Sequence, residues 1–275
     1  MTMGEPGKNG VRNSDLNECQ TILDTFFSYG HTEIDTARMY AEGTTESHLS
    51  LLNLGAATVD TKVYPTEPGW HSPEHLRAKF SESLEKLNRK KVRVFYLHAP
   101  DRSVPFEETL GEVDKMHKEG LFEIFGLSNY ASWEVAEIVG ICKTKGYVQP
   151  KIYQAMYNAV TRAIEPELVP CLRKFGMRLV VYNPLAGGFF AGKLSRADDV
   201  PQEGRFKTSD AMDRPQVVPH HSVLKPEDGV ILVRAVQLNS SKIAPIVQRA
   251  PPDEVLKALD DAWELVGSQC PPYWR

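Results

Sequence analysis

Apolar residues follow two alternating spacings along most of the chain. Segments with apolar residues three or four positions apart, as on one helix face, alternate with short runs rich in β-branched and aromatic residues, which favour strands. Helix boundaries are marked by Pro73 after Ser72, and by Gly120 and Gly146 after two helical segments. Helices are predicted over 16–29, 73–87, 106–118, 132–145 and 165–175, with a short one near 49–52. Strands are predicted over 33–36, 57–63, 92–98, 122–127, 151–154, 178–182 and 229–233, with the end of another at 1–3.

This strict alternation of strands and helices is typical of a parallel sheet with helices on its outside. The strand ends lie 25 to 36 residues apart, and about eight βα units of that length make a (β/α)8 barrel. A doubly wound sheet is the alternative, but it normally opens with a glycine-rich phosphate turn, and the chain has no GxGxxG. We therefore predict an α/β protein with the (β/α)8 (TIM) barrel fold, in a single domain over 1–275.

Two stretches predict that this barrel is incomplete. The chain begins at Met1-Thr2-Met3-Gly4, which leaves room for only the end of a first strand. Residues 207–226 contain Pro215, Pro219 and Pro226 and no amphipathic run, so no outer helix is predicted before the strand at 229–233. We expect a short first strand and no seventh outer helix.

Composition and charge exclude several classes of protein. With 41% hydrophobic and 25% charged residues the composition is ordinary for a globular protein, and the net charge of −4 gives no basic field for nucleic acid or anionic lipid. No apolar run approaches the roughly 18 residues that cross a bilayer, and residues 1–13 are too polar for a secretory signal. The four cysteines form no CxxC or Cys/His cluster, so we expect reduced thiols, no metal site and a cytoplasmic protein. We expect His220-His221, in a loop with several prolines, to be solvated rather than metal-binding.

Six successive predicted strands end in or next to a polar residue, and Tyr40 follows the first of them. In a parallel barrel all of these ends meet at one rim, where polar residues are typically catalytic. Any one of them could instead cap the following helix, and it is the series of six that favours a shared site. The residues are Asp35, Lys62, His98, Asn129, Gln154 and Tyr182.

The residue types suit the reduction of a carbonyl group. Addition of hydride to a carbonyl carbon creates an alkoxide that needs a proton, and Tyr40 is the candidate donor. A neighbouring ammonium makes a phenol a better acid; Lys62 would supply it, held by an ion pair with Asp35. His98 would orient the carbonyl oxygen or relay the proton. A Schiff-base role for Lys62, as in aldolases, is the alternative, but Asp35 would keep the amine charged.

The hydride must come from a cofactor, since no side chain can donate one. The amides of Asn129 and Gln154 suit a nicotinamide carboxamide, and Tyr182 offers a ring face for stacking. The glycine-rich run 185–193 would let backbone amides approach phosphates, or would be only a flexible turn. Its portion from Gly187 to Lys193 fits GxxxxGK, but a leucine follows in place of the Ser or Thr that would hold Mg²⁺, so we do not predict an NTPase.

Together these segments resemble the aldo-keto reductase superfamily and, within it, the aflatoxin-aldehyde reductase branch. The resemblance covers most of residues 15–206 and again about 252–275. It rests on the runs GHTEIDTA at 30–37, DTK at 60–62, FYLH at 95–98, GLSNY at 126–130, YQAMYN at 153–158, NPLAGG at 183–188, AW at 262–263 and CPPYWR at 270–275.

The resemblance implies a (β/α)8 barrel that uses NADPH to reduce aromatic aldehydes, dialdehydes or semialdehydes, with a possible homodimer. It assigns the catalytic tetrad to Asp35, Tyr40, Lys62 and His98. It places Arg275 at the substrate end, where it would hold a carboxylate. The residues it assigns to the cofactor are Ser128, Asn129, Gln154, Tyr182, Asn183, Leu185, Gly187, Lys193, Arg205, Gln237 and Ser241.

Departures from the family pattern leave a second function open. The family has a full first strand, a seventh outer helix, and a Gly-Ala-Ser-Ser-like turn before the helix that grips the adenosine 2′-phosphate, where this chain reads Val233 to Lys242. Gln237 and Ser241 match the adenosine contacts only loosely, and Arg234 or Lys242 would meet the phosphate by charge alone. The alternative is a catalytically impaired barrel that binds nucleotide or a protein partner.

Overall fold

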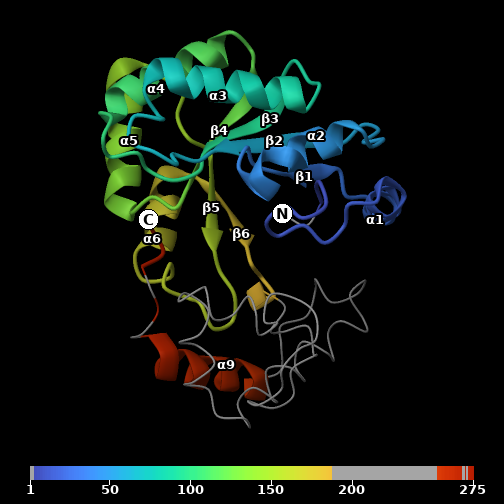
Figure 1. Cartoon of the computed structure of the whole chain (residues 1–275). Helices are drawn as coiled ribbons and strands as arrows, with labels where there is room; N and C mark the ends of the chain where they lie inside the picture. Colours follow the sequence, from blue (N-terminus) through green and yellow to red (C-terminus); the bar gives the residue numbers. More distant parts are fainter. Residues whose placement is uncertain (1–2, 188–252, 268–269, 271) are drawn as a thin grey trace. The chain divides into compact units, whose positions relative to one another are not determined.

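The computed structural model describes residues 3–187, 253–267, 270 and 272–275 (Figure 1). The chain divides into two compact units: unit 1 is Met1–Gln154, Leu168–Val180 and Trp274–Arg275, and unit 2 is Ala155–Glu167 and Val181–Tyr273. Several sequence predictions fall outside the described residues: Met1-Thr2 of the first strand, the absent helix at 207–226, the loop with His220-His221, and the strand at 229–233. A single domain over 1–275 stays a prediction.

Six strands form one sheet in the order β1-β2-β3-β4-β5-β6, and the pairs from β1 to β5 are parallel. Each strand therefore lies beside its neighbour in the sequence. This is the strand order of a (β/α)8 barrel, of which the described residues contain six strands, so the predicted fold class is confirmed. The strands are β1 Glu33–Asp35, β2 Thr58–Val63, β3 Val92–Leu97, β4 Phe122–Ser128, β5 Ile152–Met156 and β6 Arg178–Tyr182.

The helices from α1 to α6 follow the predicted order, whereas α9 was not predicted. Asp15 caps the first, because its Oδ1 accepts hydrogen bonds from the backbone N–H groups of Asn17 and Glu18, both at 2.9 Å. The bounds of α4 and α5 are those predicted. The helices are α1 Leu16–Ser28, α2 Thr44–Ser50 after the 3₁₀ turn η1 Tyr40–Gly43, α3 Pro73–Lys86, α4 Phe106–Lys118, α5 Ser132–Lys145, α6 Leu168–Phe175 and α9 Asp253–Val266.

Two predicted helices differ from the structure by more than one residue: the one predicted from residue 165, and the short one near 49–52, which is α2 Thr44–Ser50. The helix predicted from residue 165 begins at Leu168, because Pro166 disfavours helical backbone in the residue before it. The short helix predicted near 49–52 ends at Ser50, whose hydroxyl donates to the Ser47 carbonyl at 2.7 Å and so competes with the helix. Leu51 follows the end of this helix and is exposed.

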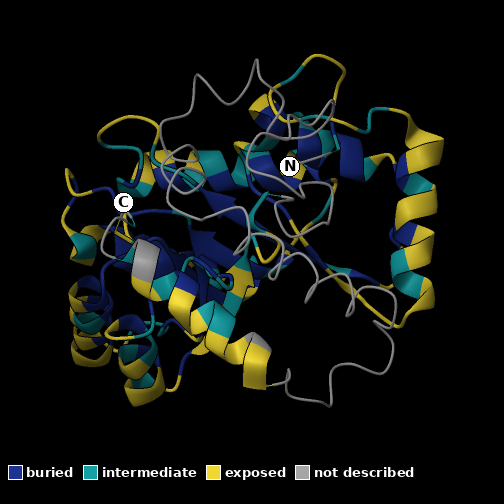
Figure 2. Ribbon diagram, turned by 90° about the horizontal axis from the view of Figure 1, so that it is seen from below, coloured by how far each residue is buried: buried dark blue, intermediate teal, exposed yellow. Residues whose placement is uncertain are grey.

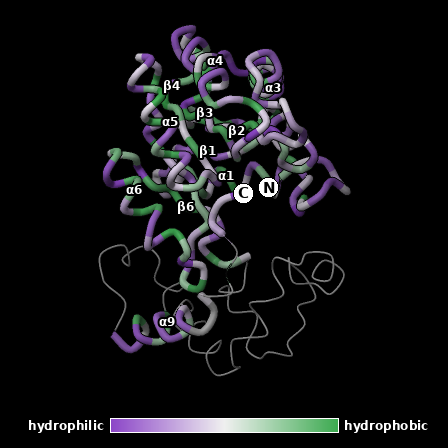
Figure 3. Tube along the Cα trace, turned by 90° about the vertical axis from the view of Figure 1, so that its left-hand side faces the viewer, coloured by the Kyte–Doolittle hydropathy of each residue, from purple (hydrophilic) through white to green (hydrophobic). Residues whose placement is uncertain are grey.

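Both faces of the unit 1 sheet are packed with apolar side chains. On the face toward α3, the Phe95 ring lies 4.2 Å from Phe80 and 5.4 Å from Phe122, measured between ring centroids. On the other face Val94, Tyr96 and Ile152 form a buried cluster. Figure 2 shows the strands largely buried, and Figure 3 shows β2 to β4 mostly hydrophobic and the outer turns of α3 and α4 mostly hydrophilic. This packing fixes the strand ends that carry the polar residues.

Gly126→Ala is expected to lower the free energy of unfolding by about 1–3 kcal/mol. A Cβ at residue 126 would collide with the Tyr96 ring, its register partner on β3, and would come within 2.9 Å of Ile152 Cγ2. Gly140→Ala in α5 is the matched control: a Cβ there meets no atom within 4 Å, and alanine favours helix by about 0.5–1 kcal/mol. Urea unfolding measures both variants, and an unchanged stability of Gly126→Ala would contradict this packing.

Candidate active site

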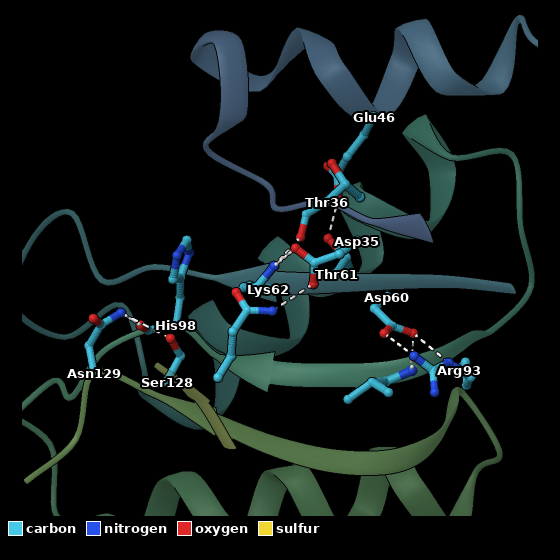
Figure 4. Close-up of polar contacts among 12 residues, drawn as sticks. Asp35, Thr36, Glu46, Asp60, Thr61, Lys62, Arg93, His98, Ser128 and Asn129 are labelled. Atoms are coloured by element: carbon cyan, nitrogen blue, oxygen red, sulfur yellow. Dashed lines mark hydrogen bonds and ion pairs between the residues drawn. The ribbon is translucent and has the colours of Figure 1, made fainter. Parts of the chain in front are cut away.

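The carboxyl ends of the unit 1 strands bring a lysine and a carboxylate into contact (Figure 4). The Lys62 side chain on β2 has no exposed surface, and its Nζ donates to Asp35 Oδ2 at 2.5 Å and to the Thr36 carbonyl at 2.8 Å. Asp35 Oδ1 accepts a hydrogen bond from Gln154 Nε2 on β5 at 2.9 Å. The predicted Asp35–Lys62 ion pair is therefore present, and it favours a charged Lys62 over the neutral amine that a Schiff-base mechanism needs.

Tyr40 lies beside this ion pair. It opens η1, a tight turn in which Ala41 and Glu42 have φ of 50° and 56°. Lys62 Nζ is 5.3 Å from the centroid of the Tyr40 ring, and the Tyr40 and His98 rings meet edge to face with centroids 6.0 Å apart. The four residues predicted as a tetrad thus form one cluster, although they come from three strands and a turn.

The His98 ring is enclosed by aromatic neighbours. Tyr64, a residue that the sequence analysis did not single out, contacts the His98 ring edge to face, with the ring centroids 5.4 Å apart. The Nδ1 atom of His98 is buried and has no hydrogen-bond partner among the described residues. Burial, followed by the charges of Lys62 and Arg275, lowers the pKa of His98 well below its usual value. The imidazole is therefore neutral at pH 7 and has one N–H to donate.

Next to His98 lies a group of uncharged polar side chains. Asn129, in a left-handed conformation with φ of 63°, donates from Nδ2 to the His98 carbonyl at 2.8 Å and to Ser128 Oγ at 3.0 Å. Because Ser128 Oγ accepts this bond, its hydroxyl proton is available to a carbonyl oxygen. Gln154 donates from Nε2 to Asp35, and the oxygen of its side-chain amide is a hydrogen-bond acceptor. A hydroxyl donor beside an amide acceptor matches a carboxamide, so these residues fit the nicotinamide end of a cofactor.

The remaining predicted cofactor residues belong to unit 2 or lie outside the described residues. Asn183, with φ of 61°, shapes the turn after β6: its Oδ1 accepts from Gly187 N at 2.5 Å, and its carbonyl accepts from Asn158 Nδ2 at 3.2 Å. Leu185 in this turn is exposed, and the Tyr182 carbonyl accepts from the Tyr157 N–H at 3.3 Å. The cofactor role of this turn stays a prediction. The residues outside the described ranges are Lys193, Arg205, Gln237 and Ser241.

Two residues that the sequence analysis missed support the rim from its loops. His71, only 1% exposed, shares a 3.3 Å hydrogen bond between its Nε2 and the Val63 carbonyl, next to Lys62. Asp101, three residues after His98, accepts from the His71 backbone N–H at 3.1 Å. Both residues lie in loops beyond the strand ends, so the pattern of one polar residue at each strand end does not include them. The Asp-x-Ser sequence at 101–103, which is typical of a turn, was the sequence signal for Asp101.

Neither a metal cluster nor a membrane span is found in the described ranges. No group of three or more His, Cys, Asp or Glu side chains there is placed to hold a metal ion. None of the helices described is long and apolar enough to cross a bilayer. All four cysteines are free thiols, as predicted.

Comparisons with known proteins show which sequences the chain is similar to. The model of the Aldo/keto reductase family matches residues 2–227. The chain is 37% identical to aflatoxin B1 aldehyde reductase member 2 of Mus musculus, over 96% of this chain and 85% of that protein. It is 36% identical to the Homo sapiens aldo-keto reductase family 7 member A3, over 96% of this chain and 94% of that protein. It is 34% identical to the aldo-keto reductase pigE of Monascus ruber, over 99% of this chain and 95% of that protein.

We expect His71→Gln to flatten the pH dependence of stability. Burial, the main cause, lowers the pKa of His71 to about 4. Unfolding restores the ordinary value near 6.5, so the unfolded chain binds the extra proton first and stability falls as the pH drops from about 6.5 to 4. Glutamine keeps a donor for the Val63 carbonyl but does not titrate.

Denaturant unfolding between pH 7.5 and pH 4.5 measures the effect. The wild-type protein should lose about 1–3 kcal/mol more than His71→Gln over this range. His31→Gln, at an exposed histidine, controls for the substitution itself. Parallel pH profiles for wild type and His71→Gln would show that the buried imidazole does not carry the effect.

Proposed function

Because the chain belongs to the aldo/keto reductase family, we propose that it reduces aldehydes to alcohols with NADPH, and that Tyr40 delivers the proton. Its relatives include proteins named as aflatoxin B1 aldehyde reductases, and the chain is an oxidoreductase of this aldehyde-reducing type. The observation that carries the residue roles is the buried Lys62 ammonium, paired with Asp35 and 5.3 Å from the Tyr40 ring centroid.

The Tyr40 phenol gives its proton to the oxygen of the carbonyl group as that oxygen becomes an alkoxide. The Lys62 ammonium stabilises the phenolate that remains, since an opposite charge nearby favours the charged form of an acid. Asp35 holds Lys62 in place and balances its charge, which is needed because the Lys62 side chain has no exposed surface. Asp35 is thus a positioning residue, whereas Tyr40 contacts the reacting oxygen.

His98 orients the carbonyl oxygen. Its lowered pKa keeps the ring neutral, so it donates a hydrogen bond without adding a positive charge that would compete with Tyr40 as the acid. The edge-to-face contacts with Tyr40 and Tyr64 limit the ring's rotation. The aldehyde oxygen would therefore lie between the Tyr40 hydroxyl and the His98 N–H.

When bound, NADPH supplies the hydride. Ser128 and Gln154 would hold its carboxamide through one donor and one acceptor, and Asn129 would position both Ser128 and His98. We propose that Tyr182 stacks on the nicotinamide ring and that Asn183, Leu185, Gly187, Lys193 and Arg205 line the phosphates, with Gln237 and Ser241 at the adenosine. The Asn183 side chain orders the turn at 183–187, which supports a role for the backbone N–H groups of this turn in binding phosphate.

The proposed substrates are aromatic aldehydes, dialdehydes and semialdehydes. Arg275 would hold the carboxylate of a semialdehyde, and the hydrogen bond from its backbone N–H to the Asn129 carbonyl supports a place near the reacting group. We also propose a cytoplasmic location, a single domain over 1–275, and a homodimer.

Tyr40→Phe is expected to reduce kcat for an aromatic aldehyde by about 10²-fold or more, because it removes the proton donor and nothing else. NADPH binding should stay within about two-fold of wild type, since no predicted cofactor contact involves the phenol oxygen. Stopped-flow NADPH oxidation measures turnover, and quenching of protein fluorescence measures binding.

Tyr29→Phe is the matched control: Tyr29 is 72% exposed, and its loss of a hydroxyl should leave kcat unchanged. Full activity in Tyr40→Phe would reject the assigned donor. NADPH binding by the wild-type protein without turnover on a broad panel of aldehydes would instead favour the impaired nucleotide-binding barrel.

A further inference from the structure

The segment Trp274–Arg275 belongs to unit 1 and lies on the rim of the site. The Arg275 backbone N–H donates to the Asn129 carbonyl at 3.0 Å, and Asn129 Nδ2 donates to the His98 carbonyl at 2.8 Å. Two hydrogen bonds through one residue therefore connect Arg275 to His98. The Arg275 charge is also one of those felt by the His98 ring.

Arg102 contacts this segment from the loop after β3. Its guanidinium carbon lies 5.7 Å from the centroid of the Trp274 ring, within the range of a cation–π contact. The loop itself is ordered by Asp101, whose Oδ1 accepts from the Ser103 N–H at 3.1 Å and from its hydroxyl at 2.5 Å. Arg102 therefore reaches Trp274 from a fixed base.

The direction of the Arg102 side chain is set by Glu134, near the start of α5. Glu134 has no exposed side-chain surface; its Oε1 accepts from Arg102 Nε at 2.8 Å and its Oε2 from the Ala131 N–H at 2.7 Å. A buried carboxylate is costly unless a cation and hydrogen bonds satisfy it. Arg102 therefore cannot turn away without leaving Glu134 unpaired, and its guanidinium face stays toward Trp274.

We propose that Arg102, anchored by Glu134, clamps Trp274 and thereby holds Arg275, the residue already proposed to pair with a substrate carboxylate, in place beside His98. Arg102 is a positioning residue, since it acts through Trp274. The selectivity part rests on the proposed aldehyde reduction, whereas the clamp is a property of the folded chain alone.

The clamp should favour the binding of charged substrates because it lowers the conformational entropy that Arg275 loses on binding. An arginine that is not held in place loses backbone and side-chain freedom when it pairs with a ligand, and fixing it beforehand removes part of that loss. A guanidinium–carboxylate pair then gains from its charge-assisted hydrogen bonds. Neutral aldehydes form no such pair, so the clamp should not affect them.

Trp274→Ala removes the clamped ring and leaves the buried Arg102–Glu134 pair intact. KM for succinic semialdehyde should rise about two- to five-fold, the loss expected from one cation–π contact, with kcat unchanged. KM for 4-nitrobenzaldehyde, which carries no carboxylate, should stay as in wild type. Lys143→Ala is the matched control, because Lys143 on the same helix as Glu134 also lies 5.7 Å from an aromatic ring, that of Phe175.

Arg102→Ala tests the clamp without reference to catalysis. Carboxypeptidase B removes a terminal arginine, so its rate of arginine release from the 275-residue chain reports how firmly Arg275 is held. Release should be at least two-fold faster from Arg102→Ala than from wild type or Lys143→Ala, at a temperature where melting curves show all three folded. Trp274→Ala is left out of this comparison because residue 274 is part of the cleaved sequence.

Two results would overturn the proposal. One is arginine release from Arg102→Ala at the wild-type rate. The other is a Trp274→Ala enzyme whose KM changes equally for the charged and neutral aldehydes, or for neither. Failure of the proposed function is recognised separately: a wild-type protein that reduces neither aldehyde rejects aldehyde reduction, and the release rates still decide the clamp.

Discussion

The buried ammonium of Lys62 is the constraint on which the rest of the site depends. A charge with no solvent contact costs several kcal/mol unless it is paired and hydrogen-bonded, and Asp35 with the Thr36 carbonyl meets both needs. Asp35 is the last residue of β1 and Thr36 follows it, and the pairing of Asp35 with Asp60 in the β1–β2 register brings both partners within reach. The chain just after β1 is bound to the same strand, since Arg38 N donates to the Lys62 carbonyl at 2.9 Å. The turn that carries Tyr40 is therefore placed by the contacts that satisfy the lysine.

The part of the site that could be predicted is the part that secondary structure alone determines. In parallel strands all carboxyl ends reach one rim, so Asp35, Lys62 and His98 could be grouped once the strands were located. Helix bounds were predictable where glycine marked the end, as at Gly120 and Gly146 with φ of 78° and 69°. The bound of α6 was missed because Pro166 was read as part of a helix.

The residues that were missed depend on contacts between loops. His71 meets Val63 and Asp101, and Arg102 meets Glu134 and Trp274, and no spacing in the sequence indicates these pairs. The comparisons add that the chain is shorter than its relatives: the alignment to the mouse protein extends over 315 positions, whereas 96% of this chain is about 264 residues. The relative therefore has roughly 50 positions that this chain lacks, in agreement with the interrupted family pattern read from the sequence.

Burial and the neighbouring charges explain why His98 is neutral in a cluster that also contains the Asp35–Lys62 ion pair. Asp35 pairs with the Lys62 ammonium in the interior. His98 has no carboxylate partner among the described residues, and burial followed by the charges of Lys62 and Arg275 lowers its pKa. In the proposed mechanism the carbonyl oxygen would meet a neutral N–H donor from His98 and the Tyr40 phenol, beside which lies the Lys62 ammonium. Fixed dipoles and charges of this kind favour the alkoxide over the carbonyl without any rearrangement during the reaction. A protonated His98 would itself be the strongest acid present, so in the proposed mechanism the lowered pKa of His98 leaves the proton transfer to Tyr40.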